Sequence, residues 1–120
     1  MQVINIPQAG SWEQFVALGG IYCGRSRVLG CKFIIGEDGT VERVLRLHKQ
    51  WLWHQLTAGE DQRVRVALGK LQRNAILGCY WRHAACPCHN IAKAWWWWTQ
   101  EGGHRKYASL ETPRNNTAPE

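Results

Sequence analysis

Residues 75–98 read AILGCYWRHAACPCHNIAKAWWWW and combine the pattern of a buried strand with the start of a helix. The apolar run 75–81 has the length of a buried strand, and a tight loop follows it. Cys88 and His89 then open a helix. In α/β proteins the loop at the carboxyl end of a strand faces a crevice, and the next helix offers unpaired backbone N–H groups. This stretch therefore indicates an α/β fold with its chemistry at that loop.

The rest of the chain supplies the other elements of such a fold. Short β-prone segments lie at 2–6 and 21–23, and residues 29–35 continue as an extended apolar piece. A capping-box pattern at Ser11 predicts a short helix over 12–18. Helical spacing of apolar residues predicts three further helices, at 41–56, 61–73 and 89–99. We expect a small, largely parallel, Rossmann-like sheet flanked by these helices.

Composition shows where the folded unit ends. The apolar period is lost after Gly102, and Ser, Thr, Pro and Asn dominate residues 109–120. We therefore expect one α/β domain over residues 1–101 and a disordered tail over 102–120. A chain of 120 residues buries about two thirds of its unfolded surface, so it can hold a core without disulfides or metal.

Charge and cysteine content limit the possible binding partners and the cellular compartment. The formal net charge of +6 permits contact with nucleic acid, a phosphorylated ligand or an acidic membrane, but a solvated basic surface explains it equally well. Five cysteines, an odd number, and the lack of a secretory signal pattern predict reduced thiols and a cytoplasmic protein. No apolar segment approaches the roughly 18 residues that span a bilayer, so we expect no membrane insertion.

One histidine and two tryptophans have competing interpretations. His48 falls on the apolar stripe of the helix 41–56, where a core histidine is a commoner explanation than a ligand. Trp96 and Trp97 cannot point the same way as their neighbours, because successive helical residues differ by about 100°. They form a homo-oligomer contact or a stacking surface, or the N-terminal segment covers them.

The order of these motifs resembles one family. Tyr22-Cys23-Gly24-Arg25 and the pair Cys88-His89, after the strand that carries Cys79, are its most specific pieces. The chain resembles domain of unknown function 4326, a small domain of bacteria and their phages, over about residues 3–98. This chain departs from the family pattern at Cys31, Lys32, Trp81 and Asn90, all near the expected site.

The first functional hypothesis is a ligand pocket. If the two cysteine-bearing strands are parallel neighbours, the loops after them meet at one edge of the sheet. Tyr22, Gly24, Arg25 and Cys79 would then bind an anionic small molecule, with a nucleotide as the preferred class. Cys88 and His89 are the candidate catalytic pair, with a lowered pKa expected for the Cys88 thiol at a helix N-terminus. Whether the protein is an enzyme stays open, and we predict no cofactor.

Two alternatives remain open. Cys79, Cys86 and Cys88, with His83 or His89, have the residue types of a structural zinc site, although the C-x-C spacing of Cys86 and Cys88 differs from the usual knuckle. Basic helix faces, including the residues Arg63, Arg65, Lys70 and Arg73, could instead bind nucleic acid while Trp96 or Trp97 stacks on bases. A host-interaction module of a phage is a related possibility.

Overall fold

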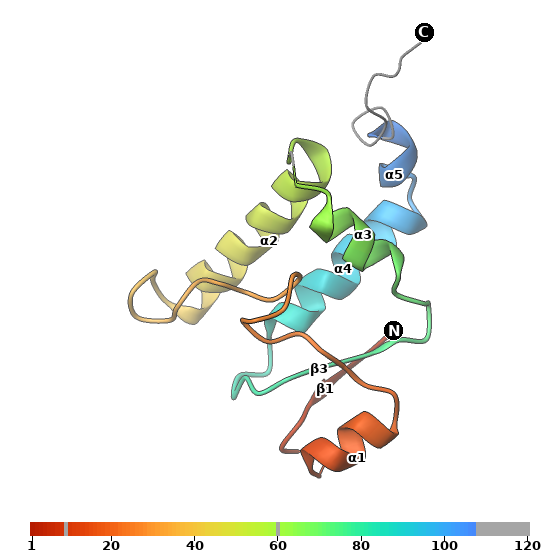
Figure 1. Ribbon diagram of the computed structural model, residues 1–120. Coiled ribbons are helices and arrows are strands. Elements are labelled where there is room, and N and C mark those ends of the chain that lie inside the picture. The colour runs from red at the N-terminus through yellow and green to blue at the C-terminus, as the bar shows by residue number, and fades with distance from the viewer. Residues whose placement is uncertain (9, 60, 108–120) are drawn as a thin grey trace, which may run out of the picture.

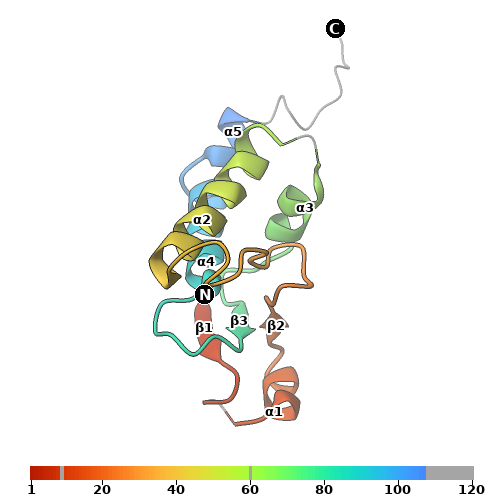
Figure 2. The ribbon, with the colours of Figure 1, turned by 90° about the vertical axis from the view of Figure 1, so that its left-hand side faces the viewer.

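The protein is built on a three-stranded parallel sheet. The computed structural model describes residues 1–8, 10–59 and 61–107. The strands β1 (Gln2–Asn5), β2 (Ile21–Tyr22) and β3 (Ile76–Cys79) are ordered β1-β3-β2, as Figure 2 shows. Both neighbours of β3 run parallel to it. The predicted α/β class and the parallel sheet are confirmed, and the two cysteine-bearing chain segments are adjacent.

The two faces of the sheet carry different layers. Leu77 and Cys79 belong to the main hydrophobic core, whereas Gly78 between them points the other way. A Cβ on Gly78 would lie 2.3 Å from the ring of Phe15, the buried residue of α1 (Trp12–Ala17). Helix α1 begins with the predicted capping box, in which the Ser11 hydroxyl and the Gln14 side chain each accept a backbone N–H. The missing side chain of Gly78 therefore lets α1 pack on this face.

Three helices cover the opposite face (Figure 1). They are α2 (Val41–Thr57), α3 (Arg63–Gly69) and α4 (Pro87–Thr99). Helix α2 follows the predicted apolar stripe, and Leu52 and Leu56 are fully buried against the core that includes Ile91 of α4. Helix α4 starts at Pro87, two residues before the predicted start, because proline is favoured in the first turn.

Two predicted elements differ from the structure. The helix expected over 61–73 is reduced to α3, and the chain after it turns so that the Leu71 carbonyl accepts the indole N–H of Trp95 at 3.0 Å. The segment 29–35, expected to be extended, forms no strand: residues 29, 30 and 35 lie in turns or bends, and residues 31–34 have no regular secondary structure. Leu29 and Cys31 are buried, and Leu29 belongs to the main hydrophobic core.

Arg65 was expected on the outer basic face of its helix, and that expectation is wrong. Its side chain is only 4% exposed. The guanidinium donates to the Leu56 carbonyl through Nε at 3.1 Å and Nη2 at 2.6 Å, and it stacks over the Trp98 ring. Arg65 therefore satisfies a carbonyl in the last turn of α2, which would otherwise be buried without a partner.

His48 is a core histidine, as the apolar stripe of α2 predicts, and it is fully buried. Its Nε2 lies 2.9 Å from the Leu29 carbonyl, which can only accept, so this nitrogen carries the proton. Its Nδ1 accepts from the amide of Asn90, 3.3 Å away, and the same amide donates to the Leu45 carbonyl. Burial lowers the pKa of His48 to about 4, so the ring is neutral near pH 7.

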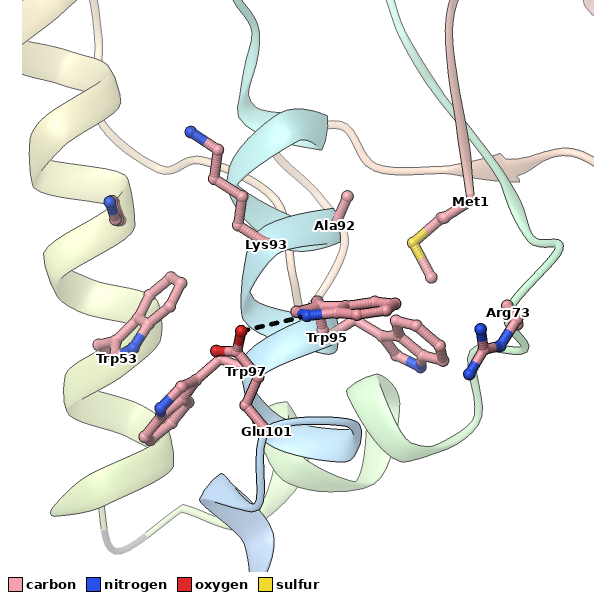
Figure 3. A pocket seen from close by; sticks show the side chains of 10 residues that line it. Met1, Trp53, Arg73, Ala92, Lys93, Trp95, Trp97 and Glu101 are labelled. Carbon is pink, nitrogen blue, oxygen red and sulfur yellow. Dashed lines mark hydrogen bonds between the residues drawn. The ribbon is translucent and has the colours of Figure 1, made fainter.

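The tryptophans at the end of α4 have separate environments (Figure 3). Trp96 is 47% exposed and donates to Glu101 at 3.2 Å. Trp97 packs between Trp53 of α2 and Tyr107, with ring centroids 5.8 and 6.1 Å away. Trp97 is therefore covered both by α2 and by the C-terminal side, whereas cover by the N-terminal segment was one of the alternatives that the sequence left open.

The helix α5 (Gly103–Lys106) lies within the predicted tail, so the folded unit extends past the boundary expected at residue 101. Its residue His104 contacts the Trp98 carbonyl through Nδ1 at 2.6 Å. The rest of the predicted disordered tail, residues 108–120, lies outside the described residues. Among the helices of the described part of the chain, none has the length and apolar character needed to cross a membrane.

Candidate functional site

The loops that follow β2 and β3 line one cavity of about 490 Å³. Gly24 and Arg25 come from the first loop, Cys79 ends β3, and Pro87 begins α4. The sequence prediction that these segments meet at one edge of the sheet is confirmed, because β2 and β3 are parallel neighbours. The wall of the cavity is completed by aromatic and aliphatic side chains, namely Tyr22, Phe33, Ile34, Ile35, Tyr80 and Trp81.

The loop that carries Arg25 is held by its own backbone. The Gly24 carbonyl accepts the N–H of Arg27 at 2.9 Å, and the Arg27 carbonyl accepts the N–H of Gly30 at 3.0 Å. A Cβ on Gly30 would lie 1.9 Å from the Gly24 carbonyl oxygen, so only glycine fits there. The Lys32 ammonium donates to the carbonyls of Arg25 and Arg27. Lys32, one of the departures from the family pattern, thus anchors the loop.

Arg25 itself is exposed, and among the residues that the structure describes it forms no ion pair with a carboxylate. Tyr22 contacts the rings of Trp12 and Tyr80 edge-on, at centroid distances of 5.6 and 5.9 Å. Arg27 does not line this cavity and instead lies over the Tyr22 ring, 5.7 Å from its centroid. The cavity therefore offers one unpaired guanidinium beside a fixed aromatic wall.

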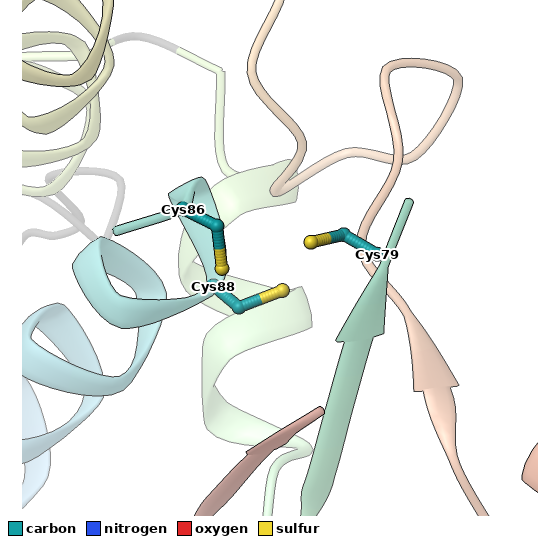
Figure 4. A group of neighbouring side chains, drawn as sticks. All are labelled: Cys79, Cys86 and Cys88. Atoms are coloured by element: carbon teal, nitrogen blue, oxygen red, sulfur yellow. The ribbon is translucent and has the colours of Figure 1, made fainter. Parts of the chain in front are cut away.

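Four buried thiols gather behind this cavity. Cys79 at the end of β3 and Cys86 and Cys88 at the start of α4 have sulfur atoms within 4.8 Å of one another, and Figure 4 shows their side chains turned toward a common point. Cys23, directly after β2, is hydrogen-bonded to Cys88. All five cysteines are free thiols, and Cys31 is the one outside this group.

The thiols of the cluster differ in acidity. Hydrogen bonds from Cys79 and Cys88 lower the pKa of Cys86, which is the N-cap of α4 and also lies near His89. The neighbouring thiols of Cys23, Cys79 and Cys86, together with burial, raise the pKa of Cys88. The hydrogen bond to Cys86 raises the pKa of Cys79 to about 11. The pKa of Cys23 is also lowered, mainly by its hydrogen bond with Cys88, so Cys23 and Cys86 are the more acidic thiols of this cluster.

The candidate catalytic pair is placed differently from its prediction. Cys88 is fully buried and does not line the cavity, and its pKa moves opposite to the expected direction. His89 is exposed one turn into α4, with Nδ1 3.4 Å from the backbone nitrogen of Cys86. Catalytic roles for these two residues stay predictions, and the thiols that line the cavity are those of Cys23, Cys31 and Cys79.

Sequence reasoning missed several residues that position the site. Asn5 at the end of β1 donates to the Trp81 carbonyl and so holds the chain after β3. The roles of Lys32 and Asn90 were also missed, because the carbonyls that they contact are set by the loop conformation and by helix packing. A polar residue at the end of a short strand was the one available signal, and Asn5 carries it.

The fold and site define a small parallel α/β domain with a cysteine cluster and an arginine-bearing loop at the carboxyl edge of its sheet. Residues 4–96 match the family described as domain of unknown function (DUF4326), and the chain belongs to this family. No curated protein and no solved structure matches the chain.

Proposed function

We propose that the cavity at the carboxyl edge of the sheet binds a small phosphorylated molecule, with nucleotides as the preferred class. The observation that carries the proposal is the position of Arg25, whose guanidinium is exposed beside the cavity that Gly24 and Cys79 also line. A planar guanidinium with free N–H groups binds phosphate or carboxylate oxygens in a bidentate manner.

Size and lining agree with this class of ligand. A volume of about 490 Å³ falls within the roughly 300–1,000 Å³ that is usual for small-molecule sites. Tyr80 and Trp81 offer aromatic faces or edges to a base, and Gly24 lets a ligand approach the backbone closely. In this proposal Arg25 binds the phosphate and the aromatic wall contacts the base.

Thermal unfolding in the presence of nucleoside mono-, di- and triphosphates, with inorganic phosphate as a fragment, tests the proposal. A ligand at about 100 times its Kd stabilises the folded chain by about 2.7 kcal/mol, which raises the Tm by several degrees. We expect Arg25→Ala to abolish this rise while leaving the Tm without ligand unchanged, because Arg25 is exposed.

Arg46, an exposed arginine of α2 that does not line the cavity, supplies the matched control. Arg46→Ala removes the same charge from the protein and should keep the full ligand response. If both variants lost the ligand-induced rise in Tm equally, the rise would depend on the net charge of the protein and not on Arg25. A wild-type chain that responds to none of these compounds would refute the proposal.

A second candidate function rests on the tryptophan surface. Trp53, Trp95, Trp96 and Trp97 line a cavity of about 510 Å³ together with Lys49, Lys93 and Arg73 (Figure 3). Lys49 lies 5.6 Å from the Trp53 ring centroid, and Arg73 lies 5.7 Å from that of Trp96. Of the four rings, Trp96 is exposed, Trp53 and Trp97 are half-buried and Trp95 is buried. An accessible aromatic ring flanked by cations is typical of surfaces that stack single-stranded nucleic acid. We propose this surface as the nucleic-acid contact.

Titration with a single-stranded oligonucleotide, followed by fluorescence anisotropy at several salt concentrations, separates the outcomes. Binding that weakens with salt and is lost in Trp96→Ala supports the second function. Trp12→Ala is the control, because Trp12 is 40% exposed on α1 and does not line this cavity. A dimer that Trp96→Ala dissociates, without oligonucleotide binding, would instead identify a homo-oligomer contact.

A further inference from the structure

We propose that Cys79, Cys86, Cys88 and His89 bind one zinc ion behind the ligand cavity. This site shares Cys79 with the proposed ligand cavity, whereas Cys86, Cys88 and His89 do not line that cavity. The three thiols come from two elements, the end of β3 and the first turn of α4. A metal here would join these two elements across the irregular loop 80–86.

The distances suit tetrahedral coordination. Zinc–sulfur bonds of about 2.3 Å place two tetrahedral sulfur ligands about 3.8 Å apart. The three sulfur atoms already lie within 4.8 Å of one another. Side-chain rotations that move each sulfur by less than about 1 Å would therefore bring them to the tetrahedral separation. Their convergence is visible in Figure 4, where each sulfur points into the space between the strand and the helix.

We assign His89 as the fourth ligand, and its ring must move closer to the cluster, because only the three sulfurs lie within 4.8 Å of one another. Its Nδ1 lies 3.5 Å from the Cys86 sulfur. With zinc–nitrogen bonds of about 2.0–2.1 Å, a tetrahedral nitrogen and sulfur stand about 3.5 Å apart. Nδ1 lies beside the backbone N–H of Cys86, so it acts as an acceptor and is the nitrogen free of a proton. Coordination replaces that weak hydrogen bond, whose length is 3.4 Å.

The surroundings favour thiolates. Backbone N–H groups stabilise two of the sulfurs, since Trp81 donates to Cys79 and Cys88 donates to Cys86. The N-terminus of α4, a helix of 13 residues, adds its partial positive charge. Three thiolates and one neutral imidazole leave one net negative charge on the complex, which these N–H groups and the basic chain accommodate.

The C-x-C spacing that argued against zinc in the sequence is explained by the helix start. Knuckle spacing applies when both cysteines sit in one turn-forming loop. Here Cys86 is the N-cap in extended conformation and Cys88 is within the first helical turn, so both sulfurs reach the end of β3. The alternative is that the thiols are small apolar core groups, which predicts no bound metal.

The first experiment measures zinc in the full chain, purified under reducing conditions and without added chelator. We expect one zinc per chain, released in proportion to thiol modification. Cys79→Ser and Cys88→Ser should each lose it. Cys31→Ser is the matched control, because Cys31 is also buried but lies outside the cluster, and it should keep one zinc per chain. Substoichiometric zinc that dialysis removes would overturn the proposal.

A second measurement uses the wild-type chain, so that unfolding of the cysteine variants cannot decide the result. Cobalt(II) replaces zinc in such sites and reports thiolate ligands through charge-transfer and ligand-field absorption. We expect the absorption spectrum of a tetrahedral thiolate site. One equivalent of zinc should displace the cobalt and abolish this absorption. An octahedral spectrum without thiolate charge transfer would overturn the site.

Two variants identify the fourth ligand. His89→Ala should weaken zinc binding by about tenfold or more and alter the cobalt spectrum. Cys23→Ser should leave both unchanged, although Cys23 touches Cys88 and is the competing ligand. The reverse result, with Cys23→Ser losing metal and His89→Ala keeping it, would overturn the assignment of His89.

Discussion

His48 shows how one buried residue organises a loop that lines the ligand cavity. Through Nε2 it holds the Leu29 carbonyl, and through Nδ1 it accepts from Asn90 of α4. It therefore connects α2 both to α4 and to the segment that leads into Phe33. The hydrogen-bond pattern requires the neutral ring, since a proton on Nδ1 would face the donating amide of Asn90.

This arrangement predicts acid-sensitive stability. The folded pKa of His48 is about 4, below its ordinary value of 6.5, so the unfolded chain takes up the proton first as pH falls. The contribution is fully present above pH 6.5 and is lost as pH falls from 6.5 towards 4. We expect the free energy of unfolding to drop by about 2 kcal/mol between pH 7 and pH 5, measured by urea titration.

His48→Gln tests the assignment, because glutamine keeps an amide donor for Leu29 but does not titrate. The variant should be less stable at pH 7 and should lose most of the pH slope. His54→Gln removes an exposed histidine of the same helix and should keep the slope. An unchanged slope in His48→Gln would show that another group causes the acid sensitivity.

At the scale of elements, the packing of α2 against α3 depends on an arginine. Arg65 of α3 reaches the Leu56 carbonyl in the last turn of α2 and covers the Trp98 ring of α4. Arginine can do this because its planar group donates from two nitrogens to one oxygen while its face stacks on an aromatic ring. One buried side chain thus links three helices.

We predict that Arg65→Met lowers the free energy of unfolding by about 2–4 kcal/mol, because it leaves the buried Leu56 carbonyl without its donor. Arg65→Lys should recover part of this loss. Arg63→Met, in the same helix but exposed and paired only with Asp61, should leave the denaturation midpoint unchanged. Equal effects at both positions would indicate a general charge effect.

At the scale of the whole molecule, the parallel sheet explains why the candidate sites share one edge. Strands β2 and β3 both end at that edge, and α4 begins there after a short loop. The ligand cavity opens between the two loops, and the thiol cluster lies beside it, with Cys23 and Cys79 belonging to both. The tryptophan surface belongs to the far half of α4, so its occupancy can be tested separately from that of the edge.

Several features followed from the sequence alone because their causes are local. An apolar run and short β-prone segments located the strands, helical spacing of apolar residues located α2, and the capping pattern at Ser11 located α1. A strand–loop–helix motif placed Cys79 and Arg25 at one edge once both strands were taken as parallel. These depend on neighbours within a few residues, or on one general rule of parallel sheets.

Tertiary structure alone decided the rest, because those contacts join residues that are distant in sequence. The pKa of Cys88 is raised by the neighbouring thiols of Cys23 and Cys79. The expectation of a lowered pKa considered only the position of Cys88 at a helix N-terminus. Arg65 turned inward because a carbonyl of another helix needed a donor. Burial and hydrogen-bond partners are properties of the packed chain, whereas periodicity reports only which face of an element is apolar.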